Sequence, residues 1–532
     1  MSVKITHLRL GLEELEEILP ARAALRLGLG PDDVLRWRIL RKSLDARRHD
    51  DLHFDYAMEI EVSQDEIRRI ASRHDPDVQP FQPETFYWPE PGTRRLDHRP
   101  VIVGAGPAGL IAGYLLAEQG YGPLILERGR AVRDRVADVR RFDEGGPLDP
   151  ESNYLFGEGG AGTFSDGKLT SRNTGADVLR ILEILADCHG KPSIVYEHRP
   201  HLGSNRLPLV VRTLRRKFEE MGGEIHFSCR VEDLDIRDGR MLGLQTSSGH
   251  VPAQVVVLAT GHSARDTYGM LLRRGVPLEA KPFQLGVRIE QPQEQIDAAR
   301  FGPRSGHPAL GAADYGLSVR AGHCDLFTFC MCAGGYVMPS VSEPGYFCTN
   351  GMSESRHDSP FANSGLVVTV EPEETGSSHP LAGVFFQQRY ERLAYLAGGR
   401  SYAAPIQWAS DFLRGRPSRG TVPSSYCRGT VSTDLAGLLP SSISSALDHG
   451  LPVMDRQLQG LFLKSATLTG PEARGSSPVR IVRDPATRQC PAVLGLYPCG
   501  EGAGFAGGII SAAVDGLRTA RAICAIHAIP GR

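Results

Sequence analysis

The pattern of apolar and polar positions divides the chain into stretches of different character. Residues 3–10 alternate as a strand does, residues 12–27 repeat with the spacing of a helix, and residues 34–62 contain two extended runs. The Ser-Gln-Asp-Glu sequence at residues 63–66 is typical of a helix start and predicts a second helix. Prolines between residues 80 and 91 then disfavour further helix. These elements predict a small α+β unit followed by a linker.

A regular succession of strands and helices begins after residue 99. Residues 101–103 and 123–126 are short apolar runs, and a glycine turn and a helical pattern lie between them. Apolar strands that alternate with helices are typical of a parallel sheet covered on both faces. Further strands are predicted at residues 225–227, 255–258 and 495–499, and further helices at residues 209–221 and 509–526.

The stretch from residue 281 to residue 480 is less regular and rich in glycine, serine and proline. At 532 residues the chain is too long for one core. We therefore predict an α/β protein in which an inserted α+β substrate domain interrupts a Rossmann-like domain, preceded by a small N-terminal α+β domain. The expected segments are the N-terminal domain, the first Rossmann-like part, the insertion and the last Rossmann-like part, at residues 1–95, 96–280, 281–480 and 481–532.

The glycine turn after the first apolar run has the spacing of a dinucleotide-binding loop. Gly104 permits the tight turn, Gly106 lets a pyrophosphate approach the backbone, and Gly109 lets helix and strand pack closely. The following helix offers its N-terminal N–H groups to the phosphates, and Glu127 can accept hydrogen bonds from a ribose. FAD and NAD both suit such a site, and a tight turn without ligand is the alternative. The predicted contacts are Gly104, Gly106, Pro107, Ala108, Gly109, Glu127 and Arg128.

Two later segments resemble the two-dinucleotide-binding-domain class of flavoproteins. Residues 257–261 look like the motif in which a strand ends beside the cofactor, and residues 495–504 look like the C-terminal motif of the class. There an acid binds the ribityl or pyrophosphate region, and Glu501 replaces the usual aspartate. The helix that begins near Gly508 would favour negative charge on a reduced flavin. The resemblance implies FAD, with contacts at Val231, Ala259, Thr260, Gly261, Gly500, Glu501, Gly508 and Ile509.

A closer resemblance covers nearly the whole chain. The bacterial FAD-dependent dehydrogenase family with a small N-terminal domain is similar at residues 157–169, 261–268, 280–290 and 329–335. This resemblance supports FAD more strongly than any one reaction. Ala333 stands where the family has proline, and residues 471–478 differ from its Glu-Thr-Arg-Thr-Ser-Ser-Pro form. Both departures are expected to alter the substrate pocket.

The first of these similar stretches contains a compact glycine loop. It combines backbone N–H groups, two hydroxyls and one ammonium, which suits a pyrophosphate or a flavin edge. Asp166 is out of place beside a phosphate unless it meets a ribityl hydroxyl or Lys168. The alternative is a structural loop without ligand. The predicted cofactor contacts are Gly160, Thr163, Ser165, Asp166 and Lys168.

Two cysteines are candidates for catalysis. Cys330 and Cys332 share one side of a predicted strand, because strand side chains alternate. They can face the flavin and relay electrons as a thiol pair, or they are buried small side chains. Together with Cys324 and Cys348 they lack the paired spacing of ordinary zinc sites, so no metal is expected.

A charged segment before the C-terminal motif supplies the remaining catalytic candidates. Arg474 can clamp a substrate carboxylate and Glu472 can move a proton, unless the two form a structural ion pair. Ser476 can help to orient the substrate. His262 follows the cofactor strand and is an acid or base, a flavin contact, or a satisfied loop histidine.

Composition limits the classes of partner. Lys and Arg number 60 against 62 Asp and Glu, and this net charge of −2 argues against nucleic acid or an anionic membrane. Ten cysteines and the lack of a leader-like start predict a reducing cytoplasm, and no apolar run is long enough to span a bilayer. One basic cluster either binds a polyanion or forms a solvated strand edge: Arg36, Arg38, Arg41, Lys42, Arg47 and Arg48.

These observations favour an FAD-dependent dehydrogenase or reductase that acts on an unidentified small molecule. A second glycine fingerprint for NAD(P) is not evident, so NAD(P)H is expected as a transient electron donor or is replaced by another electron-transfer partner. The alternatives are a flavin-dependent monooxygenase and an RNA-binding or RNA-modifying flavoprotein that uses the basic N-terminal domain.

Overall fold

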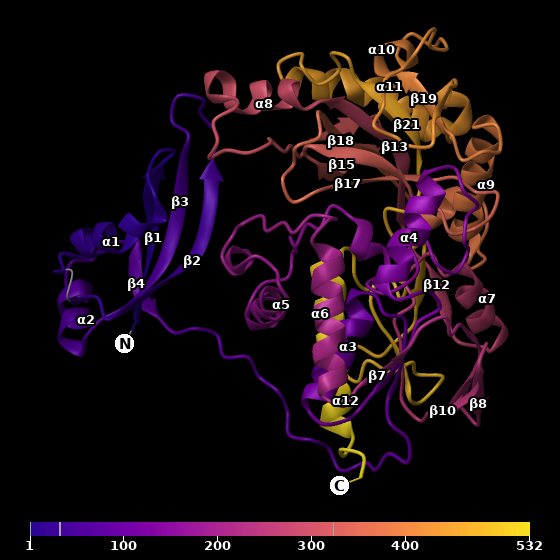
Figure 1. The fold of residues 1–532 in the computed structure, drawn as a ribbon, viewed down its shortest axis with the longest axis horizontal. Coiled ribbons are helices and arrows are strands. Elements are labelled where there is room, and N and C mark those ends of the chain that lie inside the picture. Colours follow the sequence, from indigo (N-terminus) through magenta and orange to yellow (C-terminus); the bar gives the residue numbers. More distant parts are fainter. Residues whose placement is uncertain (1, 31–32, 323, 532) are drawn as a thin grey trace.

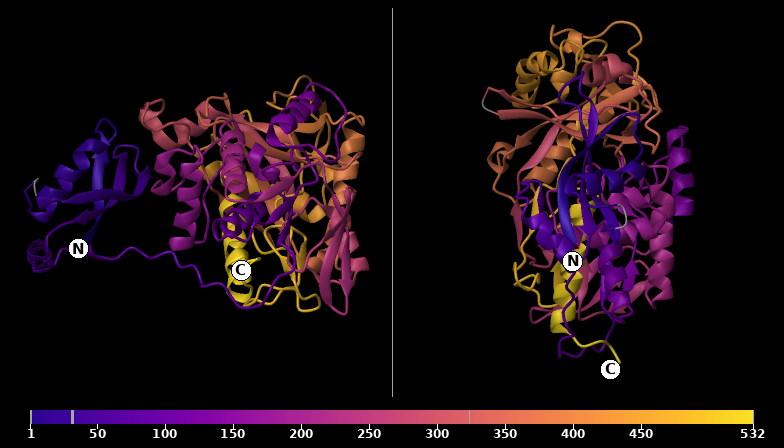
Figure 2. Two further views of the ribbon diagram at one scale, coloured as in Figure 1. Left: turned by 60° about the horizontal axis from the view of Figure 1, so that its bottom comes forward. Right: turned by 90° about the vertical axis from the view of Figure 1, so that its left-hand side faces the viewer.

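The computed structural model describes residues 2–30, 33–322 and 324–531. A large body lies beside a smaller N-terminal unit (Figure 1). One extended segment, residues 82–100, leads from the unit along the body toward the C-terminus (Figure 2). Near its end it meets the last residues of the chain through a bridge between Arg94 and His527. Its prolines explain why the segment stays extended.

The N-terminal unit is an antiparallel sheet covered by two helices. Its strands follow the order β2-β3-β1-β4, and alternate residues of β1 and β3 are buried under the helices. The Ser63 side chain accepts a hydrogen bond from the backbone N–H of Glu66, as the sequence predicts for a helix start. The elements are β1 (Ser2–Gly11), a 3-10 helix (Glu16–Ile18), α1 (Leu19–Leu27), β2 (Arg36–Asp45), β3 (His53–Glu61), α2 (Gln64–Ala71) and β4 (Val78–Phe81).

The body contains a five-stranded parallel sheet assembled from distant parts of the chain. Its order is β23-β11-β5-β6-β7, so the C-terminal strand β23 pairs with β11 in the middle of the sequence. The strands are β5 (Val101–Val103), β6 (Leu124–Leu126), β7 (Glu224–His226), β11 (Val256–Leu258) and β23 (Leu496–Pro498). This arrangement confirms the Rossmann-like fold that the sequence predicts.

Both faces of this sheet are covered, which explains its uninterrupted apolar strands. Four helices pack on one face, and a three-stranded sheet and a helix pack on the other. The helices of the first face are α3 (Pro107–Glu118), α5 (Ala176–Asp187), α6 (Leu207–Glu220) and α12 (Ile509–Ile526), and α12 has the predicted bounds. The second face is covered by β8 (Val231–Arg237), β9 (Arg240–Thr246), β10 (Gly249–Pro252) and α7 (Arg265–Arg273).

The segment that looks irregular in the sequence folds into a regular seven-stranded sheet. Its order is β14-β15-β18-β13-β21-β19-β20, and only β19 and β20 pair in parallel. Its central strands are buried on both faces, so the polar alternation that marks a strand is missing. The strands are β13 (Phe283–Pro292), β14 (Ser318–Ala321), β15 (Cys324–Cys332), β18 (Phe361–Val370), β19 (Ala404–Trp408), β20 (Thr430–Ser432) and β21 (Thr467–Glu472).

The fold class is therefore α/β, with an inserted α+β part and a small N-terminal α+β unit. The domain boundaries themselves stay predictions. Within the described ranges, none of the helices is both long enough and apolar enough to cross a membrane. The remaining helices and strands are α4 (Val132–Asp143), β12 (Leu278–Ala280), α8 (Gln293–Phe301), β16 (Gly335–Pro339), β17 (Thr349–Ser353), α9 (Ala382–Ala397), α10 (Ala409–Phe412), α11 (Ser441–Gln457) and β22 (Val479–Ile481).

The N-terminal unit touches the body along its outer strand β2. The backbone N–H of Lys42 donates to the carbonyl of Tyr196, and the N–H of His198 donates to the carbonyl of Lys42. Four members of the basic cluster form ion pairs with carboxylates: Arg38 with Glu59, Lys42 with Glu16, Arg47 with Asp45 and Arg48 with Asp50. These pairs leave less positive charge for a polyanion than the sequence suggests.

Candidate functional site

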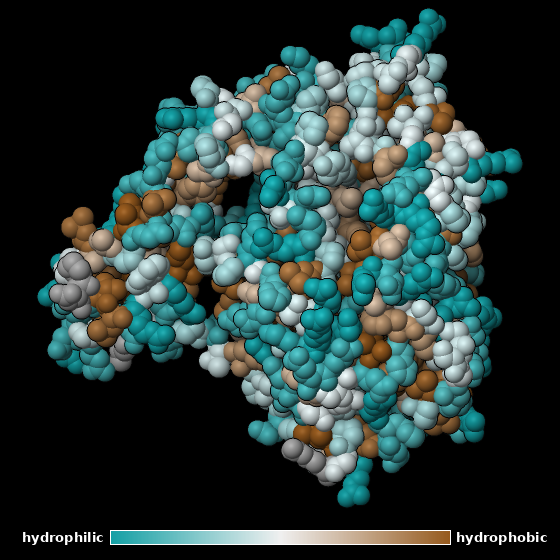
Figure 3. All heavy atoms as spheres, viewed as in Figure 1, coloured by the Kyte–Doolittle hydropathy of each residue, from teal (hydrophilic) through white to brown (hydrophobic). Residues whose placement is uncertain are grey.

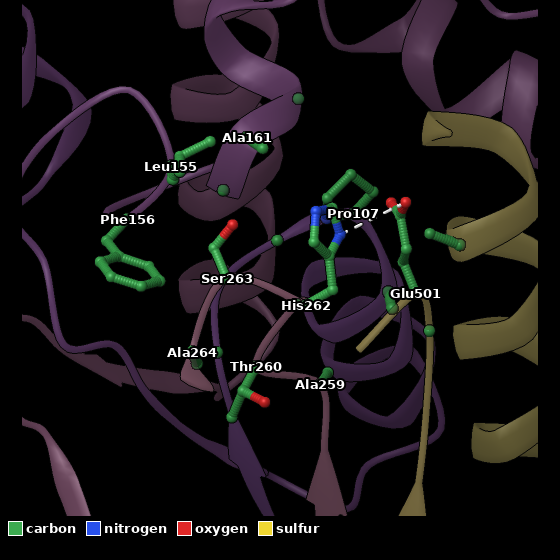
Figure 4. Close-up of a pocket in the computed structure, with 18 of the residues that line it drawn as sticks. Pro107, Leu155, Phe156, Ala161, Ala259, Thr260, His262, Ser263, Ala264 and Glu501 are labelled. Atoms are coloured by element: carbon green, nitrogen blue, oxygen red, sulfur yellow. Dashed lines mark ion pairs between the residues drawn. The ribbon is translucent and has the colours of Figure 1, made fainter. Parts of the chain in front are cut away.

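A cavity lies at the carboxyl ends of β5, β6, β11 and β23, the edge at which α/β sheets bind ligands. It holds about 1540 Å³ of empty space, part of it open to solvent, and it extends to residues of the seven-stranded sheet. Figure 4 shows the part around the segment that follows β11. The predicted cofactor residues that line it are Gly104, Gly106, Pro107, Ala108, Glu127, Arg128, Gly160, Ser165, Val231, Ala259, Thr260, Gly261, Gly500, Glu501, Gly508 and Ile509.

The three glycine positions in the turn after β5 differ in why a glycine is suited to each. Gly104 has a φ of +103°, and a Cβ there would lie 2.5 Å from the carbonyl oxygen of Ala259. A Cβ at Gly109 would lie 2.0 Å from the carbonyl oxygen of Gly104. A Cβ at Gly106 would meet nothing nearer than the Cα of Gly160, at 3.9 Å. Packing thus requires the outer two glycines, whereas the middle one leaves open space over the backbone.

Two helices begin at this cavity without capping side chains. Gly106 precedes α3 and Gly508 precedes α12, and neither residue can supply a side-chain oxygen to the first turn. The first N–H groups of a helix need a partner and carry partial positive charge. Because both helix starts line the same cavity, the site is suited to an anionic group such as a pyrophosphate.

Glu127 accepts hydrogen bonds from three separate backbone positions beside the cavity. One of its carboxylate oxygens accepts the N–H of Ala105 at 2.7 Å, and the other accepts those of Gly129 and Gly157, both at 2.9 Å. This carboxylate therefore holds the glycine turn against two other loops, a structural task that the sequence did not indicate. Its contact with a ribose stays a prediction.

His262 and Glu501 meet at the cavity from different strands (Figure 4). His262 follows β11 and Glu501 follows β23, and Nδ1 of the histidine lies 3.4 Å from Oε1 of the glutamate. Nε2 of His262 is buried and has no hydrogen-bond partner. Both residues line the same cavity as Pro107 at the start of α3, where a bound anion is expected.

Only some of the cofactor contacts predicted in the glycine loop reach the cavity. Gly160 and Ser165 line the cavity, whereas Thr163, Asp166 and Lys168, like Gly109, are not among its described lining residues. The Thr163 hydroxyl donates to the carbonyl of Glu158, and Nζ of Lys168 lies 3.2 Å from Asp166. Burial raises the pKa of Asp166, but Lys168 and His201 outweigh it and hold that pKa below its usual range. Asp166 therefore meets Lys168, one of the two partners that the sequence suggested.

Cys330 and Cys332 lie next to each other but not at equal depth. Cys330 lines the cavity, whereas Cys332 is buried and its Sγ lies 3.3 Å from the carbonyl oxygen of Cys330. A hydrogen bond from the Cys332 thiol lowers the pKa of Cys330 to about 7, and Lys168 and Arg288 act in the same direction against burial. No group of side chains suited to a metal ion occurs among the described residues.

The charged segment after β21 is arranged differently from the sequence prediction. Glu472 and Arg474 do not pair with each other: Glu472 forms an ion pair with Arg288, and Arg474 forms one with Glu391. The reason is that β21 ends at Glu472, so the two side chains enter different surroundings. Arg474 lines the cavity, whereas Glu472 and Ser476 are not among its described lining residues.

Several cavity residues carry no sequence signal of their own. Asn350 lies on the short strand β17, and its Oδ1 accepts a hydrogen bond from Arg288 at 3.1 Å. Others follow the predicted motifs so closely that a wider reading of each motif would have found them. The missed residues with polar or aromatic side chains are Phe156, Arg230, Ser263, Thr267, Phe329, Ser340 and Asn350.

Comparison with known proteins agrees with this geometry. A family model described as FAD-dependent protein, C-terminal domain-like, matches residues 282–475, and one described as FAD dependent oxidoreductase matches residues 203–322. A NAD(P)-binding Rossmann-like model matches residues 102–161, and a domain of unknown function matches residues 2–61. An uncharacterized protein of Clostridium beijerinckii is 40% identical over 528 residues, which cover 98% of each chain.

The chain belongs to the FAD-dependent oxidoreductase family. It is an oxidoreductase of a small molecule, and its cofactor is FAD.

More distant relatives of this FAD-dependent oxidoreductase match over shorter stretches or more weakly. Protein FixC of Salmonella typhi is 28% identical over 209 residues, which cover 37% of this chain and 44% of FixC. Among solved structures, L-proline dehydrogenase from P. horikoshii matches with a TM-score of 0.33 and 11% identity over 81% of this chain and 93% of that one. Glycine oxidase from Bacillus cereus gives a TM-score of 0.29 and 12% identity over 80% and 95% of the two chains.

The cavity of this FAD-dependent oxidoreductase fits its cofactor. Two uncapped helix starts and the open backbone at Gly106 suit the pyrophosphate, and His262, whose Nε2 has no partner, lines the same cavity. Val231 and Phe156 give the neighbouring wall apolar surface. The cavity therefore offers both hydrogen-bond donors for the phosphates and apolar wall for the rest of the cofactor.

Proposed function

We propose that FAD lies along this cavity and serves as the redox group of a dehydrogenase or reductase. Its adenosine half would lie toward Glu127 and Val231, its pyrophosphate at the helix starts after Gly106 and Gly508, and its isoalloxazine toward Cys330. The small-molecule substrate would bind at the end of the cavity formed by the seven-stranded sheet.

One observation carries this proposal. The same continuous cavity is lined by the glycine turn of the parallel sheet and by residues of the inserted sheet, including Phe329, Asn350 and Arg474. A nucleotide held at the first wall therefore extends toward a second wall built from another part of the chain. Small-molecule sites often lie between such structural parts, where few polar groups set orientation.

When bound, FAD supplies the hydride or electron transfer, and the protein supplies binding, orientation and electrostatics. The helix start at Ile509 stabilises negative charge in the cavity. Asn350 holds Arg288 with its carbonyl oxygen, which leaves its amide nitrogen as a donor at the cavity wall. Burial lowers the pKa of Arg474, but Glu391 more than compensates and raises it, so that guanidinium stays charged. Because Arg474 is paired with Glu391, we expect it to be a fixed charge in the cavity wall rather than a side chain that moves to bind the substrate.

The proposal is tested by the spectrum and the chemistry of the purified protein. We expect a yellow protein with one FAD per chain, and an anaerobic screen of small reductants, including NADH and NADPH, should find one that bleaches the visible flavin band. A colourless protein that does not take up added FAD would overturn the proposal. A protein that incorporates labelled oxygen from dioxygen into a product would be a monooxygenase instead.

Neither alternative function is favoured by a feature of the structure. The basic cluster that suggested RNA is largely engaged in ion pairs within the N-terminal unit. We further propose a cytoplasmic location, because the ten cysteines are not joined by disulfides in the structure, which suits a reducing compartment. Cell fractionation with an antibody to the chain checks this, and recovery outside the cytoplasm would refute it.

A further inference from the structure

Strand β15 is bent at Cys330, beside the cavity. Phe329 pairs with Gly365 and Cys332 pairs with Asn363, so three steps along β15 match two steps along β18. Cys330 takes up the extra residue with a φ of +47°, a conformation that side chains with a Cβ rarely adopt. Such bulges re-aim side chains and are common next to active sites, where strained residues also gather.

The bend gives the two cysteines different positions. The Cys330 side chain reaches the cavity wall next to Phe329 and Gly475, whereas Cys332 is 0% exposed. The Cys332 thiol remains close to Cys330 and donates a hydrogen bond to its carbonyl oxygen at 3.3 Å. In an undistorted strand the Cα atoms of residues two apart are separated by roughly 6.6 Å, near the upper end of the range that a disulfide spans.

Two cations lie beside this pair. The Arg288 guanidinium donates hydrogen bonds to the side chains of Glu472, Asn350 and Asn363. It also donates one to the carbonyl oxygen of Cys330, so this side chain anchors the bend. Lys168, which forms an ion pair with Asp166, also lowers the pKa of Cys330. Cations near a thiol favour the thiolate, which is the form that attacks a disulfide or another electrophile. Cys330 thus has the surroundings of a reactive thiol, and Cys332 those of a buried second thiol that can complete a disulfide.

We propose that Cys330 and Cys332 form a dithiol–disulfide redox centre that exchanges an electron pair with FAD in the adjacent cavity. This inference rests on the proposed placement of the isoalloxazine. In the oxidising direction the Cys330 thiolate and the Cys332 thiol form an S–S bond and lose two electrons. FAD takes up these two electrons together with the Cys332 proton and one proton from solvent. The reverse reaction returns the two thiols.

An anaerobic reductive titration of the air-oxidised holoenzyme tests the redox centre. Dithionite should deliver four electrons per FAD to the wild type, because the disulfide and the flavin each take two. C330S and C332S should each accept two electrons per FAD, half the wild-type amount. C427S, which removes the exposed cysteine, should keep the wild-type value.

Thiol labelling of the wild-type protein provides a second measurement, which does not depend on the folding of any variant. The peptide that contains both cysteines should resist alkylation in the oxidised holoenzyme, gain two labels after reduction, and be lighter by two hydrogens when intact. A yellow wild type that accepts two electrons per FAD and carries both thiols free in air would overturn the redox centre alone. A colourless protein would instead defeat the proposed function.

Discussion

At the scale of single residues, buried charges set the character of the site. Arg288, Arg265 and Arg474 are buried: Arg288 pairs with Glu472, whereas Arg265 and Arg474 share Glu391 and both also lie near Glu343. Removing one partner of such a pair is costly, because the other charge stays in a medium of low dielectric. These ion pairs hold the cavity wall in place, so the paired side chains are expected to stay fixed when a substrate binds.

Glu290 differs from these carboxylates because it has no cation bonded to it among the described residues. It lies on β13 and accepts hydrogen bonds from the backbone N–H and the hydroxyl of Ser425. Burial raises the pKa of Glu290 to about 7, and the hydrogen bonds from Ser425 only partly oppose it. The folded protein therefore binds a proton at Glu290 in a pH range where the unfolded chain does not.

E290Q should change how stability depends on pH. Since the folded-state pKa exceeds the unfolded value of 4.5, the contribution of Glu290 to wild-type stability falls as pH rises from about 4.5 to about 7 and then levels off. A shift of this size corresponds to about 3 kcal/mol, which the glutamine variant should not lose. Urea unfolding of wild type, E290Q and the exposed control E294Q at pH 5 and pH 8 measures this. Equal losses in E290Q and wild type would contradict the assignment.

At the scale of elements, the glycine turn and the two helix starts separate folding from binding. Gly109 lies where α3 packs against the turn, and Gly104 lies against the carbonyl oxygen of Ala259, which follows β11. Gly106 faces open space at the start of α3, so the fold itself does not demand a glycine there. A phosphate that approaches the backbone does demand it.

G106A should therefore fold normally but bind FAD weakly. Its added methyl group has room in the protein and occupies the space over the backbone, so we expect unchanged thermal stability without FAD and at least tenfold weaker FAD binding, or about 1.4 kcal/mol. G109A is the matched comparison: its methyl group collides with Gly104, so it should lower thermal stability itself. Flavin fluorescence titration and thermal denaturation check both variants, and wild-type affinity in G106A would place the phosphates elsewhere.

At the scale of the whole molecule, one site draws together segments from almost the entire chain. β23 pairs with β11, and α12 packs beside α3, although about four hundred residues separate the two helices in sequence (Figure 1). On the face that Figure 3 shows, polar side chains dominate, and apolar residues occur over both the N-terminal unit and the body. FAD in the cavity would touch the first and the last parts of the body at once.

Removal of FAD should loosen the C-terminal part of the chain before the rest. Ligand at a hundred times its Kd adds about 2.7 kcal/mol to stability, so the apoprotein should melt several degrees lower. Gly500, Glu501 and Gly508 line the cavity, and Gly507 and Gly508 are exposed glycines, so this segment should become the first site of proteolysis. Mass spectrometry of a limited digest, with and without FAD, shows this. Identical cleavage patterns would mean that FAD does not hold this loop.

The sequence by itself determined the elements whose signals are local. The glycine turn, the apolar strand β5 and the helix α12 were predicted closely, because their periodicity and turn residues act over a few positions. The predicted FAD contacts at Gly106, Thr260 and Gly500 came from motifs of the same kind, and all three residues line the cavity.

Only the tertiary structure decided the partners of the buried charges and the course of the central inserted strands. Glu472 pairs with Arg288 rather than Arg474, and β13 is buried on both faces, because residues far along the chain supply the neutralising charge and the covering surface. The bend at Cys330 is likewise set by pairing with β18 and by Arg288. Such long-range contacts leave no periodic trace, since each depends on where two distant segments meet.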